Sequence, residues 1–177
     1  MAKRYERYVA IGDSTSEGLD DPDGQGGYRG WANRLAERIA AQQGGLLYAN
    51  LAIRGRTAKQ IREEQLAPAL AMKPDLATVS AGTNDVLRRH FDPVAFAAEL
   101  EAMQSALVQQ GATVIIFTLP DLRAVMPLAK ILGERVLVLN DAIRATCAKT
   151  GAILCDLAAY PVAGDPRLWS DDRLHAN

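Results

Sequence analysis

Five short apolar runs recur along the chain, and each is followed by turn residues and then by a segment with helical periodicity. Runs that are rich in Val, Ile and Leu are typical of strands buried on both faces of a parallel sheet. The predicted strands cover residues 7–11, 46–51, 76–81, 113–119 and 152–157. Because strands and helices alternate, the pattern predicts a three-layer α/β fold with a parallel sheet between two layers of helices.

Between these strands, apolar residues recur at spacings of three and four, as they do on one face of a helix. The predicted helices cover residues 28–43, 58–70, 91–110 and 133–149. The third has clear end signals, with Asp92 as N-cap, Pro93 in the first turn and Gly111 as the stop. No internal repeat or linker divides the chain, and 177 residues with 49% hydrophobic content suit one domain over residues 1–177.

Charge balance and the lack of long apolar segments exclude several classes of protein. With 20 lysines and arginines against 21 acidic residues, the chain lacks the basic excess of a nucleic-acid binder. No segment approaches the roughly 18 apolar residues that cross a bilayer, and the run 8–12 is too short for a signal peptide. We therefore expect a cytoplasmic protein without membrane insertion. The two cysteines, Cys147 and Cys155, predict neither a disulfide framework nor a zinc site.

Polar residues follow the predicted strands at the point where each strand ends. Ligands of parallel α/β sheets bind outside the carboxyl ends of the strands, so these residues are expected to meet at one edge. They are residues 12–18, 52–55 and 82–85, with 170–175 following the fifth strand. This edge is the predicted site of any chemistry.

Ser14 is the candidate nucleophile at this edge. A serine needs a base within about 2.6–3.2 Å and a third group that orients the base. The chain has two histidines, His90 and His175, and Asp172 precedes His175 by one helical turn of sequence. We predict that Asp172 accepts the Nδ1 proton of His175, whose Nε2 takes the proton of Ser14 as its oxygen attacks an acyl carbon. His90 lies beside two arginines and is interpreted as a solvated residue.

Acyl transfer also requires hydrogen-bond donors for the oxyanion that forms during attack. Three donors are predicted here, each following a different strand: the backbone N–H of Ser14, the backbone N–H of Gly55 and the side-chain amide of Asn84. Gly55 lacks a Cβ, so its N–H is able to approach a substrate closely. With Ser14 and His175, these donors predict a serine hydrolase that needs no metal and no cofactor.

These residues resemble the four motif blocks of the SGNH hydrolases, also called the GDSL esterase/lipase family, in the order that the family has them. The blocks are Gly12-Asp13-Ser14-Thr15-Ser16-Glu17-Gly18, Asn50-Leu51-Ala52-Ile53-Arg54-Gly55, Gly82-Thr83-Asn84-Asp85 and Asp172-Arg173-Leu174-His175. The resemblance spans almost the whole chain and implies a flavodoxin-like αβα sandwich around a five-stranded parallel sheet. It also implies hydrolysis of carboxylic esters or thioesters by Ser14, His175 and Asp172, with Gly55 and Asn84 as oxyanion donors.

The chain departs from the family pattern after the predicted catalytic histidine. Ala176 stands where the family commonly has proline, and the sequence ends at Asn177, where members usually continue into a closing C-terminal helix. We expect a catalytic domain without this helix. Its absence would leave an apolar patch on one sheet face, and such patches favour self-association.

Several of these residues have a second interpretation. Ser14 also suits the N-cap of a helix, with Glu17 completing a capping box. Asp171 competes with Asp172 as the residue that orients His175, and family spacing favours Asp172. For Asp85 a structural role, capping the turn after the third strand, is preferred.

Tyr28 and Trp169 are interpreted either as packing residues or as walls of a substrate pocket. Tyr28 lies close in sequence to the predicted nucleophile loop, and Trp169 lies close to the predicted catalytic histidine. An acyl or alcohol group bound at the sheet edge would need apolar walls of this kind.

Two other functions compete with an esterase. The hydroxyl-rich residues 14–18 lead to a helix N-terminus, where a flavodoxin-like protein would bind phosphate or flavin. Glu17 disfavours phosphate, and the spacing matches neither the P-loop nor the dinucleotide fingerprint. A non-catalytic binding domain on the same fold is the other alternative.

We predict an esterase for small to medium acyl groups, with a small-molecule ester as its partner. The sequence does not determine the length of the acyl chain, the alcohol of the ester, whether the acyl group is also transferred to alcohols, or the oligomeric state.

Overall fold

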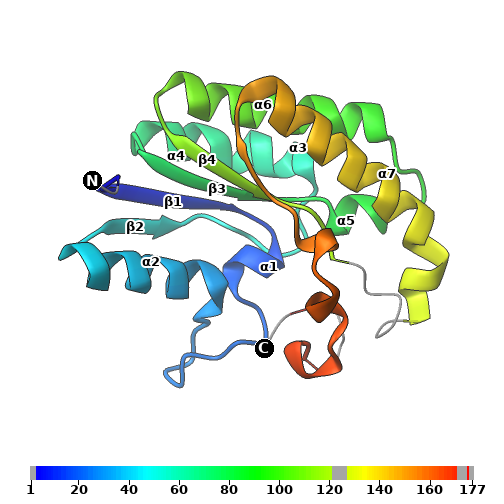
Figure 1. Cartoon of the computed structure of the whole chain (residues 1–177), viewed down its shortest axis with the longest axis horizontal. Helices are drawn as coiled ribbons and strands as arrows, with labels where there is room; N and C mark the ends of the chain where they lie inside the picture. The colour runs from blue at the N-terminus through cyan, green and yellow to red at the C-terminus, as the bar shows by residue number, and fades with distance from the viewer. Residues whose placement is uncertain (1–2, 121–126, 171–174, 176–177) are drawn as a thin grey trace.

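The computed structural model describes the backbone of residues 3–120, 127–170 and 175 (Figure 1). Its five-stranded sheet has the order β2-β1-β3-β4-β5, and every neighbouring pair is parallel. The strands are β1 (Arg7–Gly12), β2 (Leu47–Asn50), β3 (Leu76–Ser80), β4 (Thr113–Phe117) and β5 (Ile153–Cys155). The predicted strands and the parallel sheet are therefore confirmed, with ends that differ by no more than a few residues.

Helices cover both faces of this sheet (Figure 1). One face carries α2 (Gly30–Gln43), and the other carries α3 (Ala58–Ile61), α4 (Ala67–Ala71), α6 (Pro93–Gln109) and α7 (Pro127–Thr150). Two single-turn helices, α1 (Ser14–Glu17) and α5 (Thr83–Val86), follow β1 and β3. Short 3₁₀ turns follow β5 at Leu157–Ala159, Pro161–Gly164 and Pro166–Leu168. Within the described ranges, no helix has the length and apolar character needed to cross a bilayer.

Three predicted helices begin at other residues than expected; one of them is α6, expected from residue 91, which begins at Pro93 after its N-cap Asp92. The helix expected from residue 133 begins at Pro127, because proline suits a first turn and a helix interior tolerates Gly133 at a cost of about 1 kcal/mol. The helix expected from residue 28 begins at Gly30. There the chain passes so close to the end of α1 that a Cβ on Gly30 would lie 2.5 Å from the Cα of Gly18. A side chain at position 30 would therefore clash with the backbone at the end of α1.

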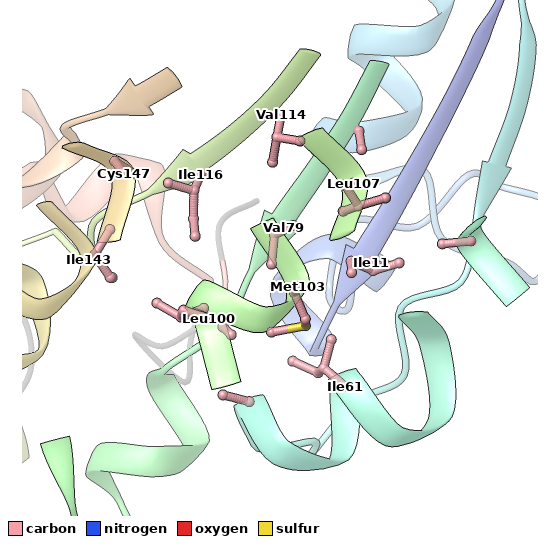
Figure 2. Packing of buried hydrophobic residues seen from close by; sticks show 14 of the residues in the cluster. Ile11, Ile61, Val79, Leu100, Met103, Leu107, Val114, Ile116, Ile143 and Cys147 are labelled. Atoms are coloured by element: carbon pink, nitrogen blue, oxygen red, sulfur yellow. The ribbon is translucent and has the colours of Figure 1, made fainter. Parts of the chain in front are cut away.

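The larger hydrophobic core lies between the sheet and the layer that contains α6 and α7 (Figure 2). Leu100, Met103 and Leu107 of α6 are completely buried and belong to the same cluster as Val79 of β3 and Ile116 of β4. Burying one side chain of this size contributes about 1.5–3 kcal/mol to folding. The packing holds β3 and β4 in the middle of the molecule.

A smaller core lies on the opposite face of the sheet, under α2. Tyr8 and Ala10 of β1 are buried there against Ala32 and Ala36 of α2. The Tyr8 hydroxyl, 2.9 Å from the Thr78 hydroxyl, satisfies its polar group inside the core. Because β1 and β3 are packed on both faces, their carboxyl ends form a rigid support for α1 and α5.

Candidate active site

Ser14 is the first residue of α1, and one residue, Asp13, separates it from the interior strand β1. Asp13 is the N-cap of this helix, and its side chain accepts a hydrogen bond from Thr15 N at 3.1 Å. The interpretation of Ser14 as the N-cap is therefore wrong, because the preceding aspartate takes that role. The hydroxyl of Ser14 is left available for another partner, and the residue is 9% exposed.

The partner of the Ser14 hydroxyl is His175. The Nε2 atom of His175 lies 2.7 Å from Ser14 Oγ, and His175 is buried with 6% of its surface exposed. This distance is within the range needed for proton transfer from a serine to a histidine base. The structure thus brings together the predicted nucleophile and the predicted base from opposite ends of the chain.

Hydrogen bonds from Ser170 hold the backbone of His175. Ser170 donates its N–H to the carbonyl oxygen of His175 at 2.8 Å, and its hydroxyl lies 3.0 Å from the same oxygen. Asp171 and Asp172 lie outside the described residues. The assignment of Asp172 as the residue that orients His175 therefore stays a prediction.

Gly55 lies in the loop after β2, with a left-handed φ of 76° that favours glycine. Glu17 of α1 ties this loop to the nucleophile helix, because its carboxylate accepts hydrogen bonds from the backbone N–H of Arg54 at 2.9 Å and from the Arg54 guanidinium at 2.7 Å. Asn50 adds a second tie by donating to the carbonyl of Ser16 at 2.7 Å. The predicted donor Gly55 is thereby held next to α1.

Asn84, on the single-turn helix α5, connects the other two parts of the predicted oxyanion hole. Its amide nitrogen donates to Asp13 Oδ2 at 3.2 Å and to the carbonyl of Arg56 at 3.1 Å. Asp13 and Arg56 are the neighbours of Ser14 and Gly55 in the sequence. A side-chain amide has two N–H donors, and in Asn84 both are used by these two acceptors. To bind an oxyanion, one N–H of Asn84 must therefore be shared between its present acceptor and the oxyanion.

Asp85 has a structural role, although not the expected one. Its carboxylate accepts a hydrogen bond from Ala58 N at 3.0 Å and so supports the start of α3 instead of capping the turn after β3. The first turn of α3 is also closed by a capping box between Thr57 and Gln60. Burial raises the pKa of the Asp85 carboxyl.

Gln65 is a residue near the site that the sequence analysis missed. Its side chain is buried and accepts from Gly12 N at 2.8 Å while donating to Gly12 O at 2.9 Å, two residues before Ser14. Gln65 lies in a π-helix, Arg62–Leu66, that joins α3 to α4. Such segments are rare and occur often near functional sites. The sequence predicts one regular helix over 58–70, and no local signal marks this change of geometry.

The carboxylate of Asp13, the residue before Ser14, is buried and accepts a hydrogen bond from the amide of Asn84. Burial raises its pKa to about 6, while hydrogen bonds from Thr15 and the charge of His175 act in the opposite direction. The negative charge on Asp13 at neutral pH is therefore held at a cost in folding free energy, because the folded environment favours the protonated form.

This burial predicts a specific pH dependence of stability. Since the folded pKa of Asp13 lies above that of an unfolded aspartate, Asp13 favours folding below about pH 4 and loses this contribution as the pH rises through about 6. From pH 4 to pH 7, wild type should lose about 2–3 kcal/mol of unfolding free energy relative to Asp13→Asn. Urea unfolding of both proteins at several pH values measures the difference; a difference that stays constant with pH would contradict this account.

The two predicted pocket residues lie close to the machinery but not within it. The guanidinium of Arg54 lies 5.2 Å above the ring of Tyr28, so Tyr28 contacts the loop that carries Gly55. Trp169 is partly buried and directly precedes Ser170, whose N–H binds the carbonyl of His175. Their contact with substrate stays a prediction. In the part of the chain that the structure describes, no three His, Cys, Asp or Glu side chains form a group that could hold a metal.

Comparisons with known proteins concern the family and the fold of the chain. The GDSL-like lipase/acylhydrolase family matches residues 10–177. The structure of TesA is 22% identical, with a TM-score of 0.79 over 97% of this chain and 89% of that chain. A lipase/acylhydrolase from Enterococcus faecalis is 23% identical, with a TM-score of 0.78 over 97% and 87% of the two chains.

A third solved structure, the psychrotrophic esterase EstA from Pseudoalteromonas sp., is 20% identical, with a TM-score of 0.76 over 97% of this chain and 88% of that chain. In that structure EstA is inhibited by monoethylphosphonate. A search of curated proteins gave no match. The structural similarities confirm the predicted three-layer α/β fold.

Proposed function

The chain belongs to the GDSL-like lipase/acylhydrolase family and is a carboxylic ester hydrolase, and we propose that it cleaves esters or thioesters of small to medium acyl groups through Ser14. One observation carries this proposal: the Ser14 hydroxyl and the His175 Nε2 atom are 2.7 Å apart at the carboxyl edge of the sheet. A buried serine and histidine in this arrangement can form and break an acyl-enzyme bond.

The proposed reaction has two steps. In the first, Ser14 Oγ attacks the acyl carbon and His175 Nε2 takes its proton; the tetrahedral intermediate then collapses, and the same proton leaves with the alcohol or thiol. In the second, His175 takes a proton from water, which attacks the acyl-enzyme, and returns that proton to Ser14 as the carboxylic acid departs. Every proton that moves passes through one nitrogen atom of His175.

Three hydrogen-bond donors are assigned to stabilise the negative charge of each tetrahedral intermediate. They are the backbone N–H groups of Ser14 and Gly55 and the side-chain amide of Asn84. The hydrogen bond from Arg54 N–H to Glu17 holds the loop of Gly55 beside α1. The hydrogen bond from Asn84 to Asp13 holds the amide there. Fixed donors of this kind lower the barrier because they need no reorganisation when the charge develops. Asp172 is assigned the Nδ1–H of His175, as the family resemblance implies.

An ester series tests the proposal. We expect hydrolysis of p-nitrophenyl acetate, butyrate and octanoate between pH 5 and 9, rising with pH as a histidine base becomes neutral. The acyl-length profile then defines the acyl pocket, and acetyl thioesters of the same leaving-group acidity separate ester from thioester preference. Stoichiometric inactivation by an ethyl phosphonate, the inhibitor class in the EstA structure, is also expected. A folded protein that turns over none of these esters would contradict the proposal.

A further inference from the structure

We infer that Asp20 is a positioning residue for His175, a second carboxylate that stabilises the imidazolium formed when Ser14 loses its proton. The inference rests on the proposed function. Asp20 Oδ2 lies 3.7 Å from His175 Nδ1, on the side of the ring opposite to the Nε2 atom that faces Ser14. Asp20 belongs to none of the four motif blocks, and it reaches the site from the loop that follows the nucleophile helix.

The loop that carries Asp20 is fixed on both sides of this residue. On one side, the N–H groups of Gly18 and Leu19 donate to the carbonyl of Ser14 at 3.1 and 3.2 Å. On the other side, Asp21 donates its N–H to Gly18 O at 3.0 Å, and both of its carboxylate oxygens lie 2.8 Å from Arg34 Nη2. The position of Asp20 is thus coupled to the backbone of the nucleophile itself.

The backbone of Asp20 supports a specific role for its side chain. Its φ is 67°, in the left-handed region that residues with a Cβ rarely adopt. Aspartate tolerates this region better than most residues, and such conformations cluster at functional sites. In this conformation the carboxylate lies against the histidine, although Asp20 belongs to an exposed loop.

Ser170 links Asp20 to the backbone of His175. The Ser170 hydroxyl lies 3.4 Å from Asp20 Oδ2 and 3.0 Å from the carbonyl oxygen of His175. The carboxylate therefore meets both the ring of His175 and the serine that holds the backbone of this histidine. This contact joins the loop after α1 to the C-terminal segment.

The environment makes the interaction sensitive to charge. The imidazole side chain is 8% exposed and the Asp20 side chain is 43% exposed, so solvent weakens the interaction without removing it. At 3.7 Å the carboxylate acts mainly on the protonated ring, including the imidazolium that forms when Ser14 transfers its proton. The other carboxylates to consider are Asp13, which interacts with His175 from the end of β1, and Asp172, which lies outside the described residues.

The test compares Asp20→Asn with Asp23→Asn. Asp23 is in the same loop, and its carboxylate binds the N–H groups of Gln25 and Gly27. Removing the charge at Asp20 should lower kcat for p-nitrophenyl butyrate about three- to tenfold with little change in KM. Because the protonated ring loses a stabilising charge, the acidic limb of the kcat/KM profile should move to lower pH by about half a unit. Both differences from wild type should shrink at 1 M salt, whereas Asp23→Asn should match wild type.

Asparagine keeps the tolerance for positive φ, and Asp20→Gly provides a second variant that accepts this backbone and also removes the carboxylate. If both variants had the kcat of wild type and the same acidic limb of the kcat/KM profile, the role of Asp20 would be overturned. A loss of kcat without a shift of the limb, or one that salt does not reduce, would identify a purely structural residue and would also overturn it. Failure of wild type to hydrolyse any ester would instead overturn the proposed function.

Discussion

Ser14→Ala is expected to lower kcat for ester hydrolysis by about 10⁴- to 10⁶-fold, leaving only the catalysis that comes from binding and from the oxyanion donors. The loss follows from the geometry, because the Ser14 hydroxyl, which can form an acyl-enzyme, lies 2.7 Å from His175 Nε2. The fold should persist, since the cap of α1 belongs to Asp13 and not to Ser14. Steady-state kinetics with p-nitrophenyl butyrate measure the loss.

The same helix offers a matched control for this variant. Ser16 is fully buried, and among the described residues its hydroxyl has no hydrogen-bond partner, so Ser16→Ala removes a serine hydroxyl without touching the proposed chemistry. It should keep kcat within a few-fold of wild type. Adding His175→Ala to Ser14→Ala should cost little further activity, because the two groups act as one unit. A Ser14→Ala variant that retains a tenth of wild-type activity would contradict the assignment.

Asn84→Ala is expected to lower kcat by about 10²- to 10³-fold while changing KM little, because the amide is assigned to the oxyanion and not to the ground-state ester. This side chain also bonds to Asp13 and to the carbonyl of Arg56, so its loss frees two acceptors next to Ser14 and Gly55. Kinetics with the same p-nitrophenyl ester and urea unfolding of the same sample separate the two effects.

The control for Asn84 is Asn84→Asp, which keeps the size of the side chain but removes both N–H donors. It should lose at least as much kcat as the alanine variant, because it also places a negative charge beside the oxyanion and the carboxylate of Asp13. If either variant kept kcat within fivefold of wild type, Asn84 would not be an oxyanion donor.

The sheet and the location of the site were predictable because both depend on short-range patterns. Apolar runs such as 76–81 and 113–119 indicate buried parallel strands, and the topology of parallel sheets places the residues after them at one edge. The pairing of Ser14 with His175 required one more inference, that a serine nucleophile needs a base and that few bases are present. The structure places the two side chains 2.7 Å apart, and their catalytic roles stay a prediction.

The supporting residues were not predictable, because their positions depend on contacts between distant segments. Gln65 reaches Gly12 only because the helix after Thr57 changes to π geometry, and a regular helix pattern gives no sign of this. Asp20 lies beside His175 because of a left-handed backbone and a neighbouring contact between Asp21 and Arg34. The sequence offers Ser14 as an alternative N-cap, whereas in the structure Asp13, an equally good capping residue that directly precedes it, takes this role.

The most direct test of the central claim is to trap the covalent intermediate. Wild type, Ser14→Ala and Ser16→Ala are each treated with an ethyl phosphonate p-nitrophenyl ester, and intact mass followed by peptide mapping locates the adduct. The account predicts one adduct per chain, on Ser14, in wild type and in Ser16→Ala, with loss of ester hydrolysis in proportion to labelling, and no adduct in Ser14→Ala. An adduct on any other residue, or continued ester hydrolysis by fully labelled protein, would contradict it.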